Sequence, residues 1–140
     1  MADKPNWDEY NRGVVEEFRA NGGKVGGDFA NASMLILTCT GAKSGQPRTI
    51  PLVYSRDGER IVIIASKAGL PTHPDWYHNL VAHPDATLEM GTEKFPVHAT
   101  VESGTERQRL FDQAAALMPV FKEYEKKAPR EIPVITLKRA

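Results

Sequence analysis

Nine residues, Thr40 to Arg48, separate two apolar runs and constrain the fold more than any other stretch of the chain. The segment holds two glycines, two cations, two hydroxyl groups and a proline. Backbone N–H groups of such a loop can curl around an anion, while Lys43 and Arg48 neutralise its charge. The loop therefore predicts a phosphate site between two strands.

This loop has two alternative interpretations. A plain polar hairpin would also place glycine and proline at turn positions that need unusual dihedrals, and the residues alone leave it open. A P-loop fits less well, because Ala42 stands where the glycine before the lysine belongs. The residues after the loop also have a strand pattern instead of a helical one. Nucleoside triphosphate hydrolysis is therefore set aside.

Strand patterns recur along the chain. The first three are expected to pair consecutively as antiparallel strands, and the next two to complete a five-stranded meander with a closing strand at the end. Pro51 places the second strand at an edge or a bulge, because proline cannot donate to a sheet ladder. The expected strands are Met34–Cys39, Thr49–Tyr54, Arg60–Ala65, Ala86–Met90, Phe95–Val101 and Ile132–Leu137.

Helical spacing of apolar residues occurs in three places. Asn6 or Asp8 caps a first helix that ends at Asn21-Gly22-Gly23, and a loop follows over Lys24–Phe29. Pro74 opens a short second helix, and a third covers Glu106–Glu125 with a kink near Pro119. The first helix is expected to bury one face, made of Trp7, Tyr10, Val14, Val15 and Phe18.

This order of elements lacks a repeated βαβ unit, so we predict an α+β fold with a mainly antiparallel sheet curled into a small barrel. The chain of 140 residues suits a single domain, residues 1–140. Residues 1–32 would form an N-terminal helix and loop, and residues 33–140 the cofactor-binding barrel.

Charge and cysteine content exclude several classes of function. Eighteen basic and eighteen acidic side chains cancel, which argues against nucleic acid as a partner. Cys39 is the only cysteine, so no disulfide or cysteine cluster is expected, and a reducing cytoplasm suits the chain. His78 and His83 are five residues apart, on different helix faces, and no metal site is expected. No apolar run reaches membrane-spanning length, although the first helix leaves peripheral membrane contact open.

A second dense stretch, residues 65–80, begins where the third strand ends. Successive hairpin connections alternate between the two ends of a sheet, so this loop is expected beside the basic loop. Lys43, Arg48, Ser66 and Lys67 would then converge on one anionic ligand. No nucleophile, acid–base pair or metal cluster accompanies them, so a bound cofactor is expected to carry redox chemistry.

These residues resemble the deazaflavin-dependent nitroreductase family, split β-barrel reductases that use coenzyme F420, an 8-hydroxy-5-deazaflavin. The resemblance runs from about Ser33 to the C-terminus and rests on two motifs in the same order. They are Leu37-Thr38-Cys39-Thr40-Gly41-Ala42-Lys43-Ser44-Gly45-Gln46-Pro47-Arg48 with Pro51-Leu52-Val53-Tyr54, and Ala65-Ser66-Lys67-Ala68-Gly69 with His73-Pro74-Asp75-Trp76-Tyr77-His78-Asn79-Leu80.

The resemblance implies a role for each matching position. Lys43, Ser44, Gly45 and Arg48 would hold the coenzyme phosphate. The deazaflavin would be lined by Pro51, Leu52, Val53, Ala65, Ser66, Lys67, Ala68 and Gly69, with Trp76, Tyr77 and Asn79 completing the wall.

The resemblance also implies hydride transfer from reduced coenzyme to an electron-poor acceptor, such as a quinone, a nitroaromatic compound or a conjugated enone. Ser66 and Tyr124 would hydrogen-bond the acceptor oxygen, and Met118, Phe121 and Tyr124 would bind the acceptor. The late helix carries one tyrosine where some relatives carry several, which favours apolar acceptors over bulky nitroimidazoles.

Two other functions stay open from the sequence. One is an FMN-dependent reductase or oxidase on the same kind of barrel, because a phosphate loop alone does not distinguish the coenzymes. The other is a carrier that binds deazaflavin without turnover. A monomer and a homodimer are equally compatible with the sequence.

Overall fold

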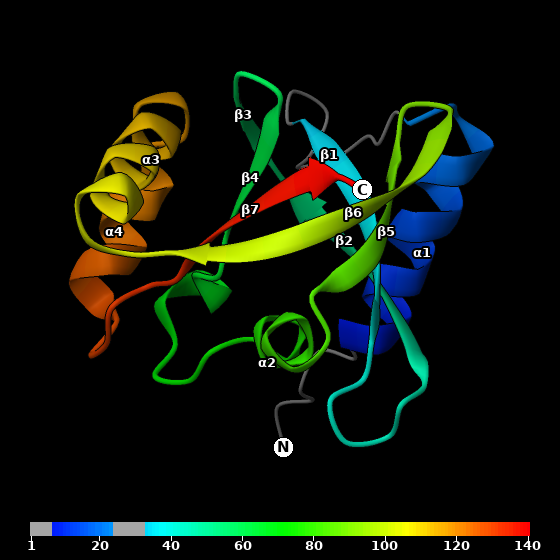
Figure 1. The fold of residues 1–140 in the computed structure, drawn as a ribbon, viewed down its shortest axis with the longest axis horizontal. Coiled ribbons are helices and arrows are strands. Elements are labelled where there is room, and N and C mark those ends of the chain that lie inside the picture. Colours follow the sequence, from blue (N-terminus) through cyan, green and yellow to red (C-terminus); the bar gives the residue numbers. More distant parts are fainter. Residues whose placement is uncertain (1–6, 24–32) are drawn as a thin grey trace, which may run out of the picture.

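One continuous antiparallel sheet organises the computed structural model, which describes residues 7–23 and 33–140. Its strands are β1 (Met34–Thr40), β2 (Pro47–Val53), β3 (Ser55–Asp57), β4 (Arg60–Ile64), β5 (Asp85–Met90), β6 (Glu93–Glu102) and β7 (Val134–Arg139). They are hydrogen-bonded in the order β2-β1-β5-β6-β7-β4-β3. The sheet curls strongly (Figure 1), which confirms the predicted α+β fold with a mainly antiparallel split barrel.

The pairing order differs from the predicted meander. β4 pairs with β7 and β3, whereas β2 pairs only with β1. The second and third expected strands, which correspond to β2 and β4, therefore do not pair with each other. The difference arises at Tyr54, the single residue between β2 and β3. At that point the chain passes from one edge strand of the sheet to the other, because the curl brings the two edges together.

The edge position predicted for the strand around Pro51 is confirmed. Pro51 lies opposite Ile36 in the β1–β2 ladder, and the far side of β2 has no strand beside it in the described sheet. A residue without an N–H group is tolerated there, because an edge strand leaves half of its backbone groups outside the ladder.

β1 is buried on both faces, which explains its nearly continuous apolar sequence. Leu35 and Leu37 point into the main core inside the curl, and both are fully buried. Met34 and Ile36 point to the opposite face and join a second cluster under the first helix. The strand therefore separates two apolar layers.

Helix α1 (Trp7–Ala20) covers that outer face. Val14, Val15 and Phe18 are buried there as predicted, but Tyr10 is 46% exposed and lies outside the buried stripe. Arg19 at the end of the helix pairs with Glu89 of β5, with N–O distances of 2.7 and 2.9 Å. This ion pair fixes the end of α1 on the sheet.

The stop predicted after α1 is also present. Gly22 and Gly23 have φ values of +64° and +95°, and the Gly23 N–H donates to the Phe18 carbonyl at 2.8 Å. A Cβ atom on Gly23 would lie 2.5 Å from Gly91 Cα in the β5–β6 turn, so glycine is required by space as well. Residue 6, the side chains of residues 7 and 8 and the expected loop at 24–29 lie outside what the structure describes.

Helices α3 (Gly104–Leu117) and α4 (Val120–Lys127) cover the other side of the sheet. The break between them falls at Met118 and Pro119, where the kink was predicted. Leu110 and Phe111 of α3 are buried against β4 and β7 in a third apolar cluster. Of the described helices, none has the length and apolarity that crossing a membrane requires.

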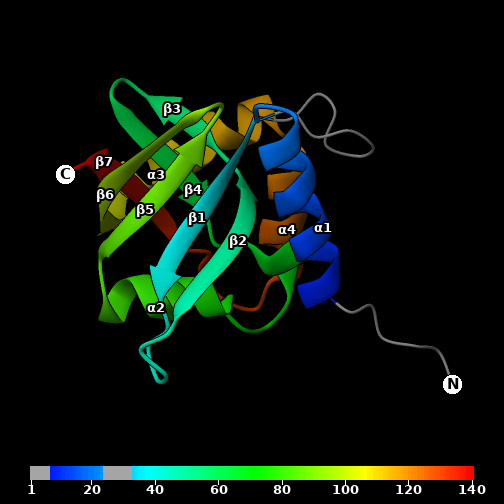
Figure 2. The ribbon, with the colours of Figure 1, turned by 90° about the vertical axis from the view of Figure 1, so that its right-hand side faces the viewer.

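The remaining helices stand at one end of the curled sheet. Helix α2 (Asp75–Ala82) and the one-turn helix η2 (Lys67–Gly69) lie at the same end as the β1–β2 loop, as Figure 2 shows. Pro74 directly precedes α2 instead of being its first residue. The two dense sequence stretches are thus gathered at one end, as expected, although the consecutive pairing from which this was predicted does not occur.

Candidate functional site

The loop between β1 and β2 folds into a compact turn. The Gly41 N–H donates to the Gln46 carbonyl at 2.8 Å, and the Gly45 N–H donates to the Gly41 carbonyl at 2.9 Å. Gly45 has a φ of +70°, which favours glycine. A Cβ atom on Gly41 would lie 2.6 Å from the Ser44 hydroxyl oxygen. The two glycines therefore permit a turn too tight for other residues.

This turn leaves hydrogen-bond donors free. The Lys43 and Ser44 amides have no acceptor among the described residues, as in the first turn of a helix. Lys43 and Arg48 are exposed, and neither pairs with a carboxylate in the described part of the chain. Arg48 donates instead to the Ser44 hydroxyl at 3.4 Å. Free amides beside two free cations form a place where an anion can bind.

Asn79 of α2 holds the turn in place. Its side-chain oxygen accepts the Ala42 N–H at 2.8 Å, and its amide nitrogen lies 3.7 Å from the Cys39 sulfur. Asn79 is 8% exposed, so this link between α2 and the basic loop is shielded from water. Burial raises the pKa of the Cys39 thiol, which keeps it protonated and unreactive at neutral pH.

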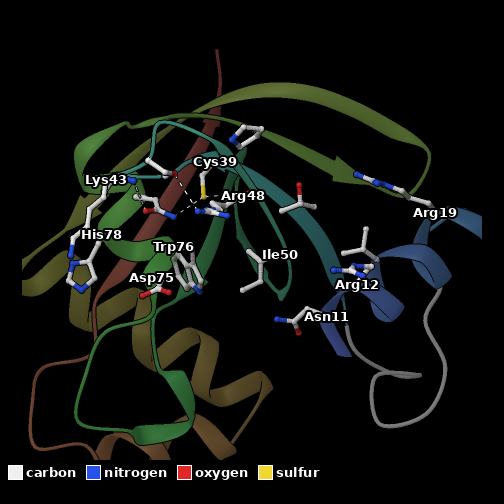
Figure 3. A pocket seen from close by; sticks show the side chains of 17 residues that line it. Asn11, Arg12, Arg19, Cys39, Lys43, Arg48, Ile50, Asp75, Trp76 and His78 are labelled. Carbon is white, nitrogen blue, oxygen red and sulfur yellow. Dashed lines mark hydrogen bonds between the residues drawn. The ribbon is translucent and has the colours of Figure 1, made fainter. Parts of the chain in front are cut away.

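A cavity of about 880 Å³ opens beside the turn. It extends from the basic loop past Trp76, which is 5% exposed, and reaches α1 (Figure 3). Among the described residues that line it, Asp75 is the one acid. The lining residues are Asn11, Arg12, Val15, Arg19, Cys39, Gly41, Ala42, Lys43, Ser44, Pro47, Arg48, Thr49, Ile50, Asp75, Trp76, His78 and Asn79.

The contribution of α1 to this cavity was missed from the sequence. Asn11 and Arg12 line it from the side opposite the basic loop (Figure 3). Their position on the polar face of α1, next to the buried stripe, was the only available signal. Arg19 also lines the cavity, but its guanidinium is held by Glu89.

Some of the residues expected to bind the cofactor lie together in the cavity, and others do not. Lys43, Ser44, Arg48, Trp76 and Asn79 line it, and Gly45 shapes the turn. Leu52 and Tyr77 are half-buried against the main core, and Val53 packs against the α1 cluster. Pro51, Leu52, Val53, Tyr77 and residues 65–69 are not part of its lining.

Residues 65–73 form a second loop at this end of the sheet, and hydrogen bonds hold its conformation. Ala65 is fully buried and Ser66 is 8% exposed, while the exposed Lys67 has a φ of +45° and donates to the Thr72 hydroxyl at 3.0 Å. Lys67 therefore does not meet Lys43 and Arg48 in the lining of the large cavity, although all three lie at one end of the sheet.

Two arginines that the sequence analysis did not select bind backbone carbonyl groups, and one of them, Arg130, holds this segment. Arg130 donates to the carbonyl oxygens of Ala65, Ser66 and Leu70 at 2.9 to 3.2 Å. Arg107, 5% exposed, donates twice to the Ile132 carbonyl, at 2.7 and 3.1 Å. The acceptors are backbone atoms, which have no signature in a sequence, so no motif could have revealed these contacts.

The residues expected to bind an acceptor lie on and before α4. Met118 and Phe121 line a narrow apolar cavity of about 20 Å³ that also touches Val53. Tyr124 lines a separate open cavity of about 580 Å³ and makes an edge-on contact with Phe121, with ring centroids 6.3 Å apart. Gly69 packs directly on α4, since its Cβ would lie 3.1 Å from the Tyr124 carbonyl oxygen.

No group of three or more metal-binding side chains occurs within residues 7–23 and 33–140. His73, Tyr77 and His78 instead contact one another through their rings, at centroid distances of 4.7 to 5.9 Å. Burial and the nearby Arg130 lower the pKa of His73. His73 is therefore neutral at pH 7, and its Nδ1 accepts a hydrogen bond from Arg130 at 2.8 Å.

Comparisons with known proteins show which family and which solved structures the chain resembles. A family model described as F420H(2)-dependent quinone reductase matches residues 10–139. An F420H(2)-dependent quinone reductase of Mycobacterium tuberculosis is 37% identical over 131 residues, covering 87% of this chain and 85% of that protein. The solved structure of an F420-H2 dependent reductase, FDR-A, has a TM-score of 0.69 at 34% identity and covers 76% of this chain and 94% of its own. Another solved chain, described as a domain-swapped dimer, has a TM-score of 0.71 at 30% identity and covers 95% and 98%.

Proposed function

The chain belongs to the F420H(2)-dependent quinone reductase family, and we propose that it reduces quinones or similar electron-poor acceptors with reduced coenzyme F420. When bound, the reduced coenzyme supplies a hydride to the acceptor. The protein binds and orients both molecules and excludes water.

The observation that carries the proposal is the meeting of the basic loop and α2 in one large cavity. Free amides at Lys43 and Ser44, together with the side chains of Lys43 and Arg48, suit a phosphate group. Gly41 and Gly45 let the backbone approach it closely. The volume of about 880 Å³ lies in the range of small-molecule sites and accommodates a coenzyme with a planar ring.

The expected site residues, within the cavity and beside it, each have a proposed task. Lys43, Ser44, Gly45 and Arg48 bind the phosphate, and Asn79 keeps the loop in the binding conformation through the Ala42 amide. The ring would be bordered by Pro51 to Val53, Ala65 to Gly69, Trp76 and Tyr77. Trp76 offers an apolar, almost fully buried wall that excludes water from one side.

The acceptor is proposed to lie toward α4. Tyr124 borders an open cavity, and its hydroxyl would donate to the acceptor oxygen as negative charge develops there. Ser66 makes no side-chain hydrogen bond to another described residue, so its hydroxyl is also available. Met118 and Phe121 would present an apolar surface to the acceptor, which favours quinones over polar acceptors.

Three wider features belong to the same proposal. We propose that residues 33–140 form the coenzyme-binding unit and that residues 1–32 add a covering helix to it. A cytoplasmic location suits the single, buried thiol. For oligomeric state, the proposal is a monomer or a homodimer, which sedimentation analysis of the purified protein would distinguish.

Titration with each coenzyme tests the central claim. Purified protein is expected to bind coenzyme F420 much more tightly than FMN, and to oxidise the reduced form steadily when menadione is supplied. Preference for FMN would indicate a flavin enzyme. Tight binding of coenzyme F420 without turnover toward any quinone, nitroaromatic compound or enone would indicate a carrier.

A further inference from the structure

Arg130 surrounds one face of residues 65–73 with hydrogen bonds. Its Nη1 donates to the Ala65 carbonyl at 3.2 Å and its Nη2 to the Ser66 carbonyl at 2.9 Å. Its Nε donates to the Leu70 carbonyl at 3.0 Å, and Nη1 also reaches His73 Nδ1 at 2.8 Å. A planar guanidinium with five N–H groups is the one side chain that can bind so many acceptors at once.

These contacts fix the direction of two peptide units. In a trans peptide the C=O and N–H bonds point in opposite directions. Because the Ala65 and Ser66 carbonyls point toward Arg130, the Ser66 and Lys67 N–H groups point away from it. Neither amide has an acceptor among the described residues. Arg130 thus leaves two adjacent donors aimed at the opposite side of the segment.

The backbone conformation makes these two donors converge. Ser66 is right-handed, with φ −76° and ψ −35°, and Lys67 follows with a left-handed φ of +45°. Successive residues of opposite hand turn their N–H groups toward a common point, which is a recurrent anion-binding concavity. A left-handed φ is strained for lysine, and the hydrogen bonds from Arg130 to both sides of it hold the backbone in that conformation.

We propose that Arg130 is a positioning residue that aims the Ser66 and Lys67 amides at a negatively charged oxygen of the bound ring system. The positive charge on the carbonyl side also polarises both peptide groups, which makes their N–H groups stronger donors. This anion subsite is distinct from the basic loop, where Lys43 and Arg48 lie. The inference rests on the proposed function, since it needs a coenzyme ring beside residues 65–69.

The position of Arg130 also links the two halves of the site. Arg130 comes three residues after the end of α4. The segment it holds packs against α4, because Gly69 approaches the Tyr124 carbonyl and the Lys127 side chain. A change in Arg130 is therefore expected to disturb coenzyme binding before it disturbs the apolar core.

Three variants in the full chain test the proposal. Arg130→Lys keeps the charge but lacks the planar fork, and we expect it to weaken coenzyme F420 binding about tenfold. Arg130→Ala should weaken binding further, and added guanidinium should restore much of it. Arg109→Gln, at an exposed arginine paired with Asp57 on another part of the surface, should leave affinity unchanged.

Urea unfolding of each variant separates the outcomes. An unchanged dissociation constant in a folded Arg130 variant would overturn the proposal, and so would an equal loss in Arg109→Gln. If the alanine variant does not fold, the lysine variant decides. Failure of the unaltered protein to bind coenzyme F420 would instead refute the proposed function, together with this subsite.

Discussion

Cations on the two sides of the molecule are used in opposite ways. On the side of β1 and β2, Lys43 and Arg48 are exposed and make no ion pair with any described carboxylate. On the side of α3 and α4, Arg107 is almost fully buried, and Arg130 is half-buried with three backbone carbonyls around it.

The difference indicates which cations serve the scaffold and which serve a ligand. Burying a guanidinium costs free energy unless its N–H groups find acceptors, so Arg107 and Arg130 satisfy theirs within the fold. Leaving Lys43 and Arg48 free contributes little to stability, because exposed charges interact weakly in water. Substitutions at Arg107 and at Lys43 should therefore separate stability from binding, whereas Arg130 is held by the scaffold and is proposed to act on the ligand through it.

The largest expected effect is on stability, at Arg107. Replacing it with alanine leaves the Ile132 carbonyl without its two donors and opens a cavity beside the Phe111 ring, which lies 4.7 Å from the guanidinium carbon. We expect a loss of about 3 kcal/mol in the free energy of unfolding, measured with urea. A loss below about 1 kcal/mol would remove the distinction between the two sides.

A substitution at Lys43 should have the opposite effect, on coenzyme binding instead of on stability. Lys43→Ala is expected to weaken coenzyme F420 binding by about 1.5 to 3 kcal/mol, through loss of one charge-assisted bond. The free energy of unfolding should change by less than about 0.5 kcal/mol, because the side chain is exposed. Lys94→Ala, an exposed cation in β6, serves as the control. Unchanged affinity in the Lys43 variant would refute the phosphate role of the loop.

Tyr124 tests whether α4 belongs to the scaffold or to the acceptor site. Removing the hydroxyl in Tyr124→Phe should slow turnover of menadione about twofold to tenfold, the equivalent of one hydrogen bond. Coenzyme affinity should stay unchanged. A fall in the urea midpoint with normal turnover would place Tyr124 in the core with Phe121.

The smallest expected effect concerns the pH dependence of stability at Asp57. Hydrogen bonds from Arg109 and Arg60 hold the pKa of this carboxyl at about 2, below its ordinary value of 3.8. The ion pairs therefore stabilise the fold above pH 4, and this contribution disappears as the pH falls toward 2. The difference in unfolding free energy between the unaltered protein and Asp57→Asn should shrink over that range. A constant difference would show that the carboxyl contributes nothing through its charge.

Much of the fold could be predicted from local patterns. The apolar run before Cys39, the proline in β2 and the break at Pro119 each have one strong local consequence, and the structure shows all three. The strand order could not be predicted in the same way. It depends on a single residue, Tyr54, at which the chain changes edges, and no periodicity records that step.

The residues of the candidate site also fall into those that could be predicted from the sequence and those that could not. The residues with distinctive chemistry, such as Lys43, Arg48 and Asn79, could be selected because their spacing is unusual for packing alone. Arg12 and Arg130 could not, because an isolated arginine in a sequence does not show what surrounds it. The first lines the cavity through the placement of α1, and the second binds carbonyl groups about 60 residues earlier in the chain.

The short passage through Tyr54 has a mechanical consequence. β2 and β3 share no hydrogen bond in the described sheet, but the single residue Tyr54 links them covalently. This link holds the two edges of the sheet together at that end of the barrel. The seam can widen only toward the opposite end, where the basic loop and α2 stand. We therefore expect a bulky molecule to enter from that end.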